Sequence, residues 1–257
     1  MKHSNKPTIG KSGHVLNGWI PQEADERDWL YRSVAKAIKA APKSDLRPGC
    51  SPVEDQRQLG SCVYNAAVGA LEFLEILNKL SPFVDRSRLF AYYCARADNG
   101  DVNDDTGDTI RHAMKILAAF GTCDEKMWPY DISKFRDKPT QPCYDDAIKH
   151  VITSYYALSG VDEIRQCLTD GYPVVYGTLL FPQFEIVGHN GMVSNPGCWK
   201  KPIGGHAMLF VGHDDSVERL TSRNSWGTGW GDSGYCYISY NYIQKYASDF
   251  WTVRVEK

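Results

Sequence analysis

The stretch "DQRQLGSCVYNA", Asp55 to Ala66, places one cysteine, Cys62, between polar, glycine-marked residues and a helical pattern. Cysteine is most often a small buried hydrophobe, so its presence alone implies no chemistry. The apolar residues that follow recur at intervals of four, three, four and three from Val63 to Leu77, the repeat of one helix face. We therefore expect a helix capped by Ser61, with Cys62 in its first turn.

The position of Cys62 in this helix has a chemical consequence. Unpaired backbone N–H groups and the helix dipole favour an anion at a helix N-terminus, which lowers the pKa of a thiol. The same pattern predicts that the helix ends at Ser81-Pro82. Cys62 is therefore either a packed side chain or a nucleophile. The two possibilities differ in whether a catalytic partner for Cys62 is present elsewhere in the sequence.

A thiolate nucleophile needs a base or a cation beside it, and the histidines are the candidates. His206 lies in "GGHAMLFVGHDD", where Gly204 and Gly205 allow another segment to approach closely. His213, at the other end of the same strand-like run, is the rival. The remaining histidines stand in irregular, polar or loop surroundings that favour no catalytic role: His3, His14, His112, His150 and His189.

The group that would orient the imidazole is Asn224, in "RNSWGTGWGDSGY". An amide oxygen can accept the ring N–H and so fix the tautomer without competing for the proton. Trp226 could cover that hydrogen bond and exclude water. Taken alone, the stretch also fits an ordinary turn with two packed tryptophans.

Composition narrows the classes of function. The 257 residues are 42% hydrophobic with a net charge of -2, which offers no basic surface, so we expect no nucleic-acid partner. No run reaches the length of a membrane span, and we expect neither a signal peptide nor a membrane contact. Zinc-ligand spacings are missing, so we expect no metal and no cofactor. Of the 8 cysteines an odd number remains once Cys62 is set aside, which leaves the compartment open.

Helical patterns precede strand patterns along the chain, which predicts an α+β protein of two unlike halves. A second helix is expected in "DTIRHAMKILAAFG", from an N-cap at Asp108 to a stop at Gly121, and a shorter helical run in "WLYRSVAKAIKAAP". Strands are expected in "YPVVYGTLLF", "HAMLFVGH", "ERLTSRNSW", "GYCYISY" and "FWTVRVE". We divide the chain into a leader, 1–44, a helical domain, 45–138, and a β-rich domain, 139–257.

Together, Gly60-Ser61-Cys62, Gly205-His206-Ala207 and the block from Asn224 to Gly231 resemble the papain family of cysteine peptidases. The stretches "DLRPGCSPVEDQRQLGSC" and "GWIP" are more similar to a bacterial branch of the family than to plant papains or lysosomal cathepsins. The resemblance implies a papain-like fold, with Cys62 on a left, helical domain. His206 and Asn224 would lie on a right, barrel-like domain, with a peptide bound in the cleft between the two.

Further roles follow from the resemblance alone. The oxyanion donor falls on Gln56, with Gln58 as its rival. Gly107 matches the glycine that pairs with the substrate backbone, and Gly205 and Trp226 support the site. Ser248 or Asp249 lies at the floor of the pocket for the side chain two residues before the scissile bond. Related enzymes are blocked by an N-terminal segment, so "HVLNGWIP", with its otherwise unburied apolar side chains, is expected in or beside the groove.

Departures from the family pattern also carry information. Val63 stands where a tryptophan is usual, and Leu59 replaces a disulfide-forming cysteine, so one left-domain crosslink is absent. The sequence has no histidine-rich insertion of the kind found in carboxydipeptidases of the family, which argues against that activity. The expected activity is a monomeric cysteine endopeptidase that acts through a thioester and is inhibited by its own leader. An acyl or isopeptide transferase with the same triad, and a non-catalytic papain-fold binder, remain the alternatives.

Overall fold

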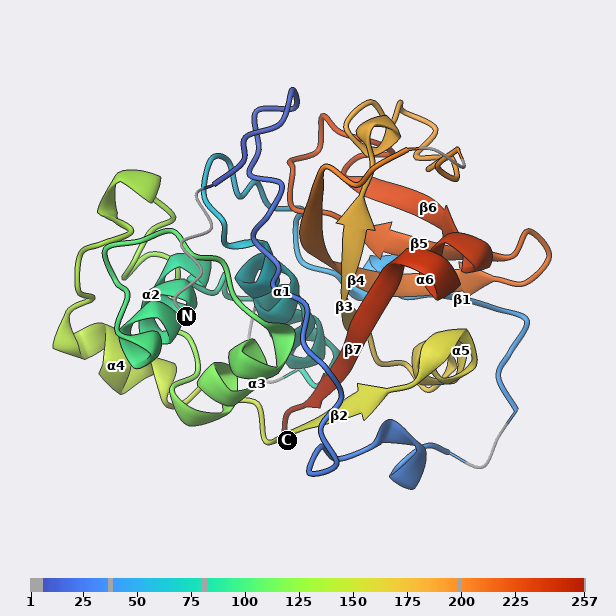
Figure 1. Ribbon diagram of the computed structural model, residues 1–257. Coiled ribbons are helices and arrows are strands. Elements are labelled where there is room, and N and C mark those ends of the chain that lie inside the picture. The colour runs from blue at the N-terminus through green and yellow to red at the C-terminus, as the bar shows by residue number, and fades with distance from the viewer. Residues whose placement is uncertain (1–6, 37–38, 80–82, 198–199, 257) are drawn as a thin grey trace.

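The computed structural model describes residues 7–36, 39–79, 83–197 and 200–256. Helices gather in one half and an antiparallel sheet forms the other, and the N-terminal segment, dark blue in Figure 1, runs down between them. This α+β arrangement is the predicted one. The bounds of the helices and strands show which parts of it the sequence pattern could specify.

The first half is built around α1, which runs from Cys62 to Leu77 as its apolar spacing predicts. Its expected end at Ser81-Pro82 lies outside the described residues. The expected N-cap is right in position, but the Ser61 side chain caps no backbone N–H of the helix. The other α-helices of this half are α2 (Arg88–Asn99), α3 (Ile110–Ala119) and α4 (Gln141–Ala147), the last of which lies beyond the proposed domain boundary at residue 138. Short 3₁₀ turns accompany them: η2 (Arg47–Gly49) and η3 (Ile132–Lys134).

The N-terminus of α3 differs from the prediction by one residue. Thr109, not Asp108, is the N-cap, and its hydroxyl accepts the N–H of His112 at 3.2 Å. The Asp108 carboxylate instead accepts the hydroxyl of Tyr64 from α1 at 2.6 Å. Asp108, which the local pattern predicts as the N-cap, therefore binds the buried Tyr64 instead of capping the helix. At the other end, Gly121 adopts a positive φ of 66°, as suits a helix stop.

The second half is a single antiparallel sheet with strand order β2-β7-β3-β4-β5-β6, and β1 also pairs with β4. All five predicted strands are present, whereas β1 and β2 were not anticipated. The strands are β1 (Lys43–Asp45), β2 (Ser154–Leu158), β3 (Val174–Leu180), β4 (Gly204–Asp214), β5 (Arg219–Arg223), β6 (Tyr235–Ser239) and β7 (Ala247–Arg254). Helices α5 (Gly160–Thr169) and α6 (Tyr240–Tyr246) and the turn η4 (Pro182–Phe184) complete this half.

Strand β4 joins the two halves, because its side chains alternate between two apolar cores. Ala207, Leu209 and Val211 belong to the core that contains α1, α2 and α3. Met208 and Phe210 belong to a second core with α5 and α6. The sheet is therefore buried on both faces, and α1 lies directly against β4. This packing brings the N-terminus of α1 to the beginning of β4.

The N-terminal segment is ordered along most of its described length. Val15, Leu16 and Trp19 are buried, although nothing within the segment could bury them. The run "WLYRSVAKAIKAAP" was expected to be helical, and its described part forms only the 3₁₀ turn η1 (Tyr31–Ser33). Here Leu30 instead makes a β-bridge to Ala157 of β2, so sheet pairing overrides local helix propensity. Strand β1 spans the proposed boundary at residue 44, which remains a prediction.

Two features bear on the class of protein. No helix within the described ranges combines the length and apolar character needed to cross a bilayer. Each of the seven cysteines in the described part of the chain is a free thiol, six of them buried: Cys50, Cys62, Cys94, Cys123, Cys143, Cys167 and Cys236. The eighth, Cys198, lies outside the described residues.

Candidate active site

Cys62 is the first residue of α1 and is completely buried. Its Sγ accepts the backbone N–H of Ala207 at 3.4 Å, so the thiol lies at the His206 end of β4. The hydroxyl of the preceding Ser61 lies 2.5 Å from the phenol oxygen of Tyr130 and accepts the side-chain amide of Asn65 at 3.0 Å. Cys62 is thus fixed by contacts from both halves of the molecule.

The structure brings His206 and Asn224 together. Nε2 of His206 lies 2.7 Å from Oδ1 of Asn224, which also accepts the N–H of Ser225 at 2.8 Å. The Trp226 ring lies 5.1 Å from the imidazole and covers this hydrogen bond. Nδ1 of His206 is buried without a hydrogen-bond partner, which leaves it available for proton exchange. The rival His213 lies at the other end of β4, beside Thr169 and Asp215.

Burial shifts both titratable groups of the pair toward their neutral forms. Removal from water raises the pKa of Cys62 to about 12 and lowers the pKa of His206 to about 4. At neutral pH the covered site therefore holds a thiol and an imidazole. This differs from the lowered thiol pKa that the helix N-terminus suggested, because the cost of desolvation exceeds the effect of the helix.

Gln56 is buried behind the nucleophile loop, while Gln58 is exposed. The Gln56 Oε1 accepts the Ser225 hydroxyl at 2.7 Å, which leaves its Nε2 as the group that faces the loop. Nε2 donates to the carbonyl of Leu59 at 3.1 Å and to the carbonyl of Val15 at 3.4 Å. Ser225 of the β-rich half therefore orients the Gln56 amide, and the Val15 carbonyl of the N-terminal segment accepts a hydrogen bond from its Nε2.

The N-terminal segment, 14–20, crosses directly over Cys62. A Cβ placed on Gly18 would lie only 2.9 Å from the Cys62 Sγ and 2.7 Å from the carbonyl oxygen of Gly60. The Gly18 carbonyl accepts the N–H of Asp108 at 3.0 Å, and the Trp19 N–H donates to the Gly205 carbonyl at 3.2 Å. Backbone hydrogen bonds therefore fix this segment to both halves of the molecule, and Figure 1 shows it running between them.

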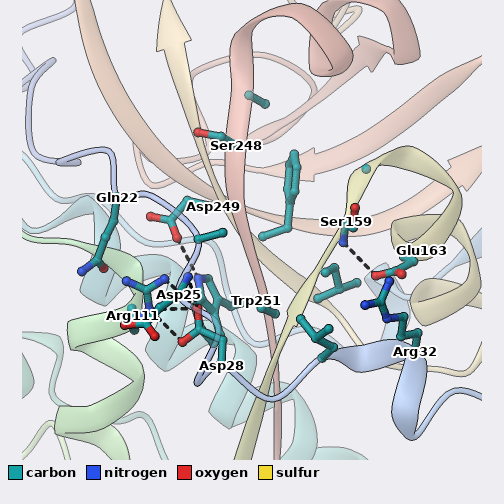
Figure 2. A pocket seen from close by; sticks show the side chains of 17 residues that line it. Gln22, Asp25, Asp28, Arg32, Arg111, Ser159, Glu163, Ser248, Asp249 and Trp251 are labelled. Carbon is teal, nitrogen blue, oxygen red and sulfur yellow. Dashed lines mark hydrogen bonds and ion pairs between the residues drawn. The ribbon is translucent and has the colours of Figure 1, made fainter.

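Trp19 fills a slot in the right half. Its ring lies against Gly177, where any Cβ would collide with the indole, and its Nε1 donates to Oδ2 of Asp249 at 3.2 Å. The other Asp249 oxygen accepts the Trp251 indole at 2.7 Å, and burial raises the pKa of Asp249. Ser248 and Asp249 line a cavity of about 460 Å³, and in Figure 2 Asp249 lies between Ser248 and Trp251.

A match to the family model described as papain family cysteine protease covers residues 40–249. The chain belongs to the papain family of cysteine proteases. This confirms the predicted family, fold and class of enzyme, and the protein is a cysteine peptidase.

Individual relatives agree with this assignment. The structure of xylellain, a cysteine protease from Xylella fastidiosa, is 35% identical, with a TM-score of 0.86 over 100% of this chain and 99% of that one. An uncharacterised peptidase C1-like protein of Acanthamoeba polyphaga mimivirus is 33% identical over 92% of this chain and 86% of its own. A procathepsin B of Trypanosoma congolense shares the fold at 16% identity, with a TM-score of 0.73 over 94% of this chain and 87% of that one.

Several residues around the papain-family site escaped the sequence interpretation. His14 stacks on Trp226 at a ring distance of 5.1 Å and lies 3.0 Å from Asp55. Tyr130 donates to the Gln56 carbonyl at 3.0 Å, and Asp105 binds the backbone of Gly60. His14, Asp105 and Tyr130 lie far from the three motifs in sequence, and no local pattern marks them. No cluster in the described ranges could hold a metal ion.

Proposed function

We propose that this peptidase cleaves peptide bonds through Cys62, His206 and Asn224. In the open enzyme the Cys62 thiol passes its proton to His206, the resulting thiolate attacks the peptide carbonyl, and His206 gives this proton to the leaving amine. The oxyanion is held by the Gln56 side chain and the backbone N–H of Cys62, and water then hydrolyses the thioester. Asn224 holds the imidazole in the required tautomer. The 2.7 Å contact between His206 and Asn224 supports this assignment, together with the free Nδ1 of His206.

We propose that the substrate is an extended peptide held by backbone hydrogen bonds. The groups offered to it are those that the N-terminal segment uses, the N–H of Asp108 beside Gly107 and the carbonyl of Gly205. The substrate side chain that replaces Trp19 would enter the slot beside Gly177 and reach Asp249. A basic side chain there would gain the buried Asp249 carboxylate as a partner. An apolar side chain would offer no replacement for the Trp19 indole, and Asp249 would keep only its hydrogen bond from Trp251.

We further propose that the N-terminal segment inhibits the enzyme in the intact chain. The observation that carries this proposal is the position of Gly18, which leaves no room for a substrate carbonyl above the Cys62 Sγ. A tethered segment acts at high effective concentration, so a few backbone hydrogen bonds suffice to hold it. Solved relatives named procathepsins are precursor forms, which is in keeping with this role.

Digestion of a peptide library tests the reaction. The intact chain, a chain lacking residues 1–21 and the same short chain with Cys62→Ala are compared for hydrolysis and for labelling by a thiol alkylator. We expect rapid cleavage only from the short chain with Cys62, and a peptide of residues 10–25 should slow it again. Equal rates in the intact and shortened chains would refute inhibition. Adducts with added amines, in place of hydrolysis, would favour the acyl-transfer alternative.

A further inference from the structure

Two loops form the left wall of the cleft beside Cys62. One leads from Gln56 to the nucleophile, and the other carries Gly107 toward the N-terminus of α3. In the family pattern a cysteine at the position of Leu59 would crosslink this wall by a disulfide, and here that cysteine is missing. The two loops nevertheless lie in a fixed relation, and a carboxylate connects them.

Asp105 makes the connection. The Gly60 N–H donates to both of its carboxylate oxygens, at 3.0 and 2.9 Å. The Tyr92 hydroxyl donates to the same carboxylate at 2.6 Å and accepts the N–H of Gly107 at 3.1 Å. An unbroken path of hydrogen bonds therefore runs from Gly60, through Asp105 and Tyr92, to Gly107.

The surroundings of this path keep it rigid. Tyr92 is fully buried in α2, and the Arg96 guanidinium lies 4.4 Å from the centre of its ring. Arg96 also donates to the Val102 carbonyl at 2.7 Å, which fastens the loop that carries Asp105. A Cβ at Gly60 would lie 2.9 Å from Asp105, so the close approach of the carboxylate depends on this glycine.

We propose that Asp105 is a positioning residue that, through Tyr92, holds the nucleophile loop and the substrate-pairing backbone at Gly107 as one unit. The inference rests on the proposed function, because it assumes that Cys62 reacts with a peptide aligned along Gly107. A shift of either loop would misplace the scissile carbonyl relative to Sγ, and reaction rates are sensitive to displacements of about 1 Å.

The charge of Asp105 has a second, separable effect. A carboxylate near Cys62 disfavours the thiolate, and Asp105 contributes in this sense to the raised pKa of Cys62. Asparagine at position 105 would keep Oδ1, which accepts from Gly60 and Tyr92, but would replace Oδ2, the second acceptor of Gly60, with an amide group and remove the charge. Alanine would remove both the charge and the hydrogen bonds. The two substitutions therefore separate positioning from electrostatics.

The test uses the full chain carrying Gly18→Ala, a change expected to open the cleft. Asp105→Ala, Asp105→Asn and Tyr92→Phe are added to this parent, with Asp104→Asn as the control, because Asp104 is the exposed neighbour in the same loop. Active sites are titrated with a thiol alkylator, so that kcat and KM refer to competent enzyme. The rate of alkylation is recorded as a function of pH.

We expect Asp105→Ala to raise KM and lower kcat, with kcat/KM reduced about 10- to 100-fold. Asp105→Asn should retain kcat/KM within about threefold, since its oxygen still accepts both donors, and should move the alkylation profile to lower pH. Tyr92→Phe should mainly raise KM, because the Gly107 N–H loses its acceptor. Asp104→Asn should match the parent.

Unchanged kcat/KM per titrated site in Asp105→Ala would overturn the inference, as would a loss confined to the number of titratable sites. If Asp105→Ala does not fold, Tyr92→Phe decides, and a parental KM in this variant would overturn the inference. An unmoved alkylation profile in Asp105→Asn would contradict only the effect of the Asp105 charge. A parent that alkylates at Cys62 but cleaves no peptide would contradict the proposed function instead.

Discussion

Gly18→Ala should raise the population of the open enzyme. The added Cβ would lie 2.9 Å from the Cys62 Sγ and 2.7 Å from the Gly60 carbonyl oxygen, well inside the 3.5–4.0 Å of an ordinary carbon contact. Neither neighbour can yield easily, because Gly60 is held by Asp105 and Cys62 begins a buried helix. The segment that carries Gly18 must therefore lift.

Overpacking of this kind costs about 1–3 kcal/mol in a well-packed site. A cost of that size against the covered state multiplies the open population by roughly 5 to 150, since about 1.4 kcal/mol corresponds to a factor of ten. Both labelling of Cys62 by a limiting alkylator and hydrolysis of a small peptide should rise by this factor at neutral pH, as long as the open state stays minor.

The matched control is Gly188→Ala. Gly188 is exposed, and a Cβ there would meet nothing within 4 Å, so labelling and hydrolysis should stay at the wild-type rate. Circular dichroism and thermal unfolding establish that both variants are folded. Equal labelling rates in Gly18→Ala and wild type would refute the reasoning, because they would mean that the segment over Cys62 does not control access to the thiol.

Three further outcomes follow from the geometry. In the Gly18→Ala background, Gln56→Ala should lower kcat roughly 10²- to 10³-fold, the usual effect of losing one oxyanion donor, and Gln58→Ala should leave kcat unchanged; the reverse result would reassign the donor. Asp249→Ala should reduce cleavage of peptides with a basic side chain two residues before the scissile bond relative to apolar ones, and an unchanged ratio would exclude Asp249 from that pocket. In the unfolded chain His206 binds a proton below its ordinary pKa of 6.5, whereas the folded chain binds it only below about 4. The free energy of unfolding of the full chain should therefore fall by about 3 kcal/mol as the pH drops through this window, and urea titrations of His206→Ala should lack that part of the pH dependence.

Local patterns predicted the elements whose burial is periodic. Helix α1 follows from the spacing between Val63 and Leu77, and β4 follows from the apolar run after His206, because each presents regular faces to a core. Strand β2 was missed since its residues Ser154–Leu158 are mostly half-buried and lack a clear alternation. The leader near Tyr31 has a helical pattern but forms no α-helix, because Leu30 pairs with Ala157, more than a hundred residues away in the sequence.

The candidate site likewise has a part that the sequence predicts and a part that only the structure shows. Its motifs, around Cys62, His206 and Asn224, are short and are readable from the sequence alone. The side chains that orient them are not, because each contact joins segments distant in sequence: Ser225 to Gln56, Tyr130 to Ser61, and Asp105 to Gly60. The pKa shifts of Cys62 and His206 arise from burial, which only the three-dimensional arrangement reveals.

The N-terminal segment is anchored on both sides of the nucleophile. Before the cleft, the Ser12 N–H donates to Glu185 at 3.1 Å, and beyond it Asp28 pairs with Arg111 at 2.6 Å. Between these anchors, the residue over the nucleophile is a glycine, which contributes backbone hydrogen bonds and no side-chain packing. Most of each core is made by residues outside the segment, which contributes Trp19 to one core and Leu16 to the other. Lifting the central part therefore exposes Cys62 to water and substrate while both halves, and the anchors themselves, stay in place.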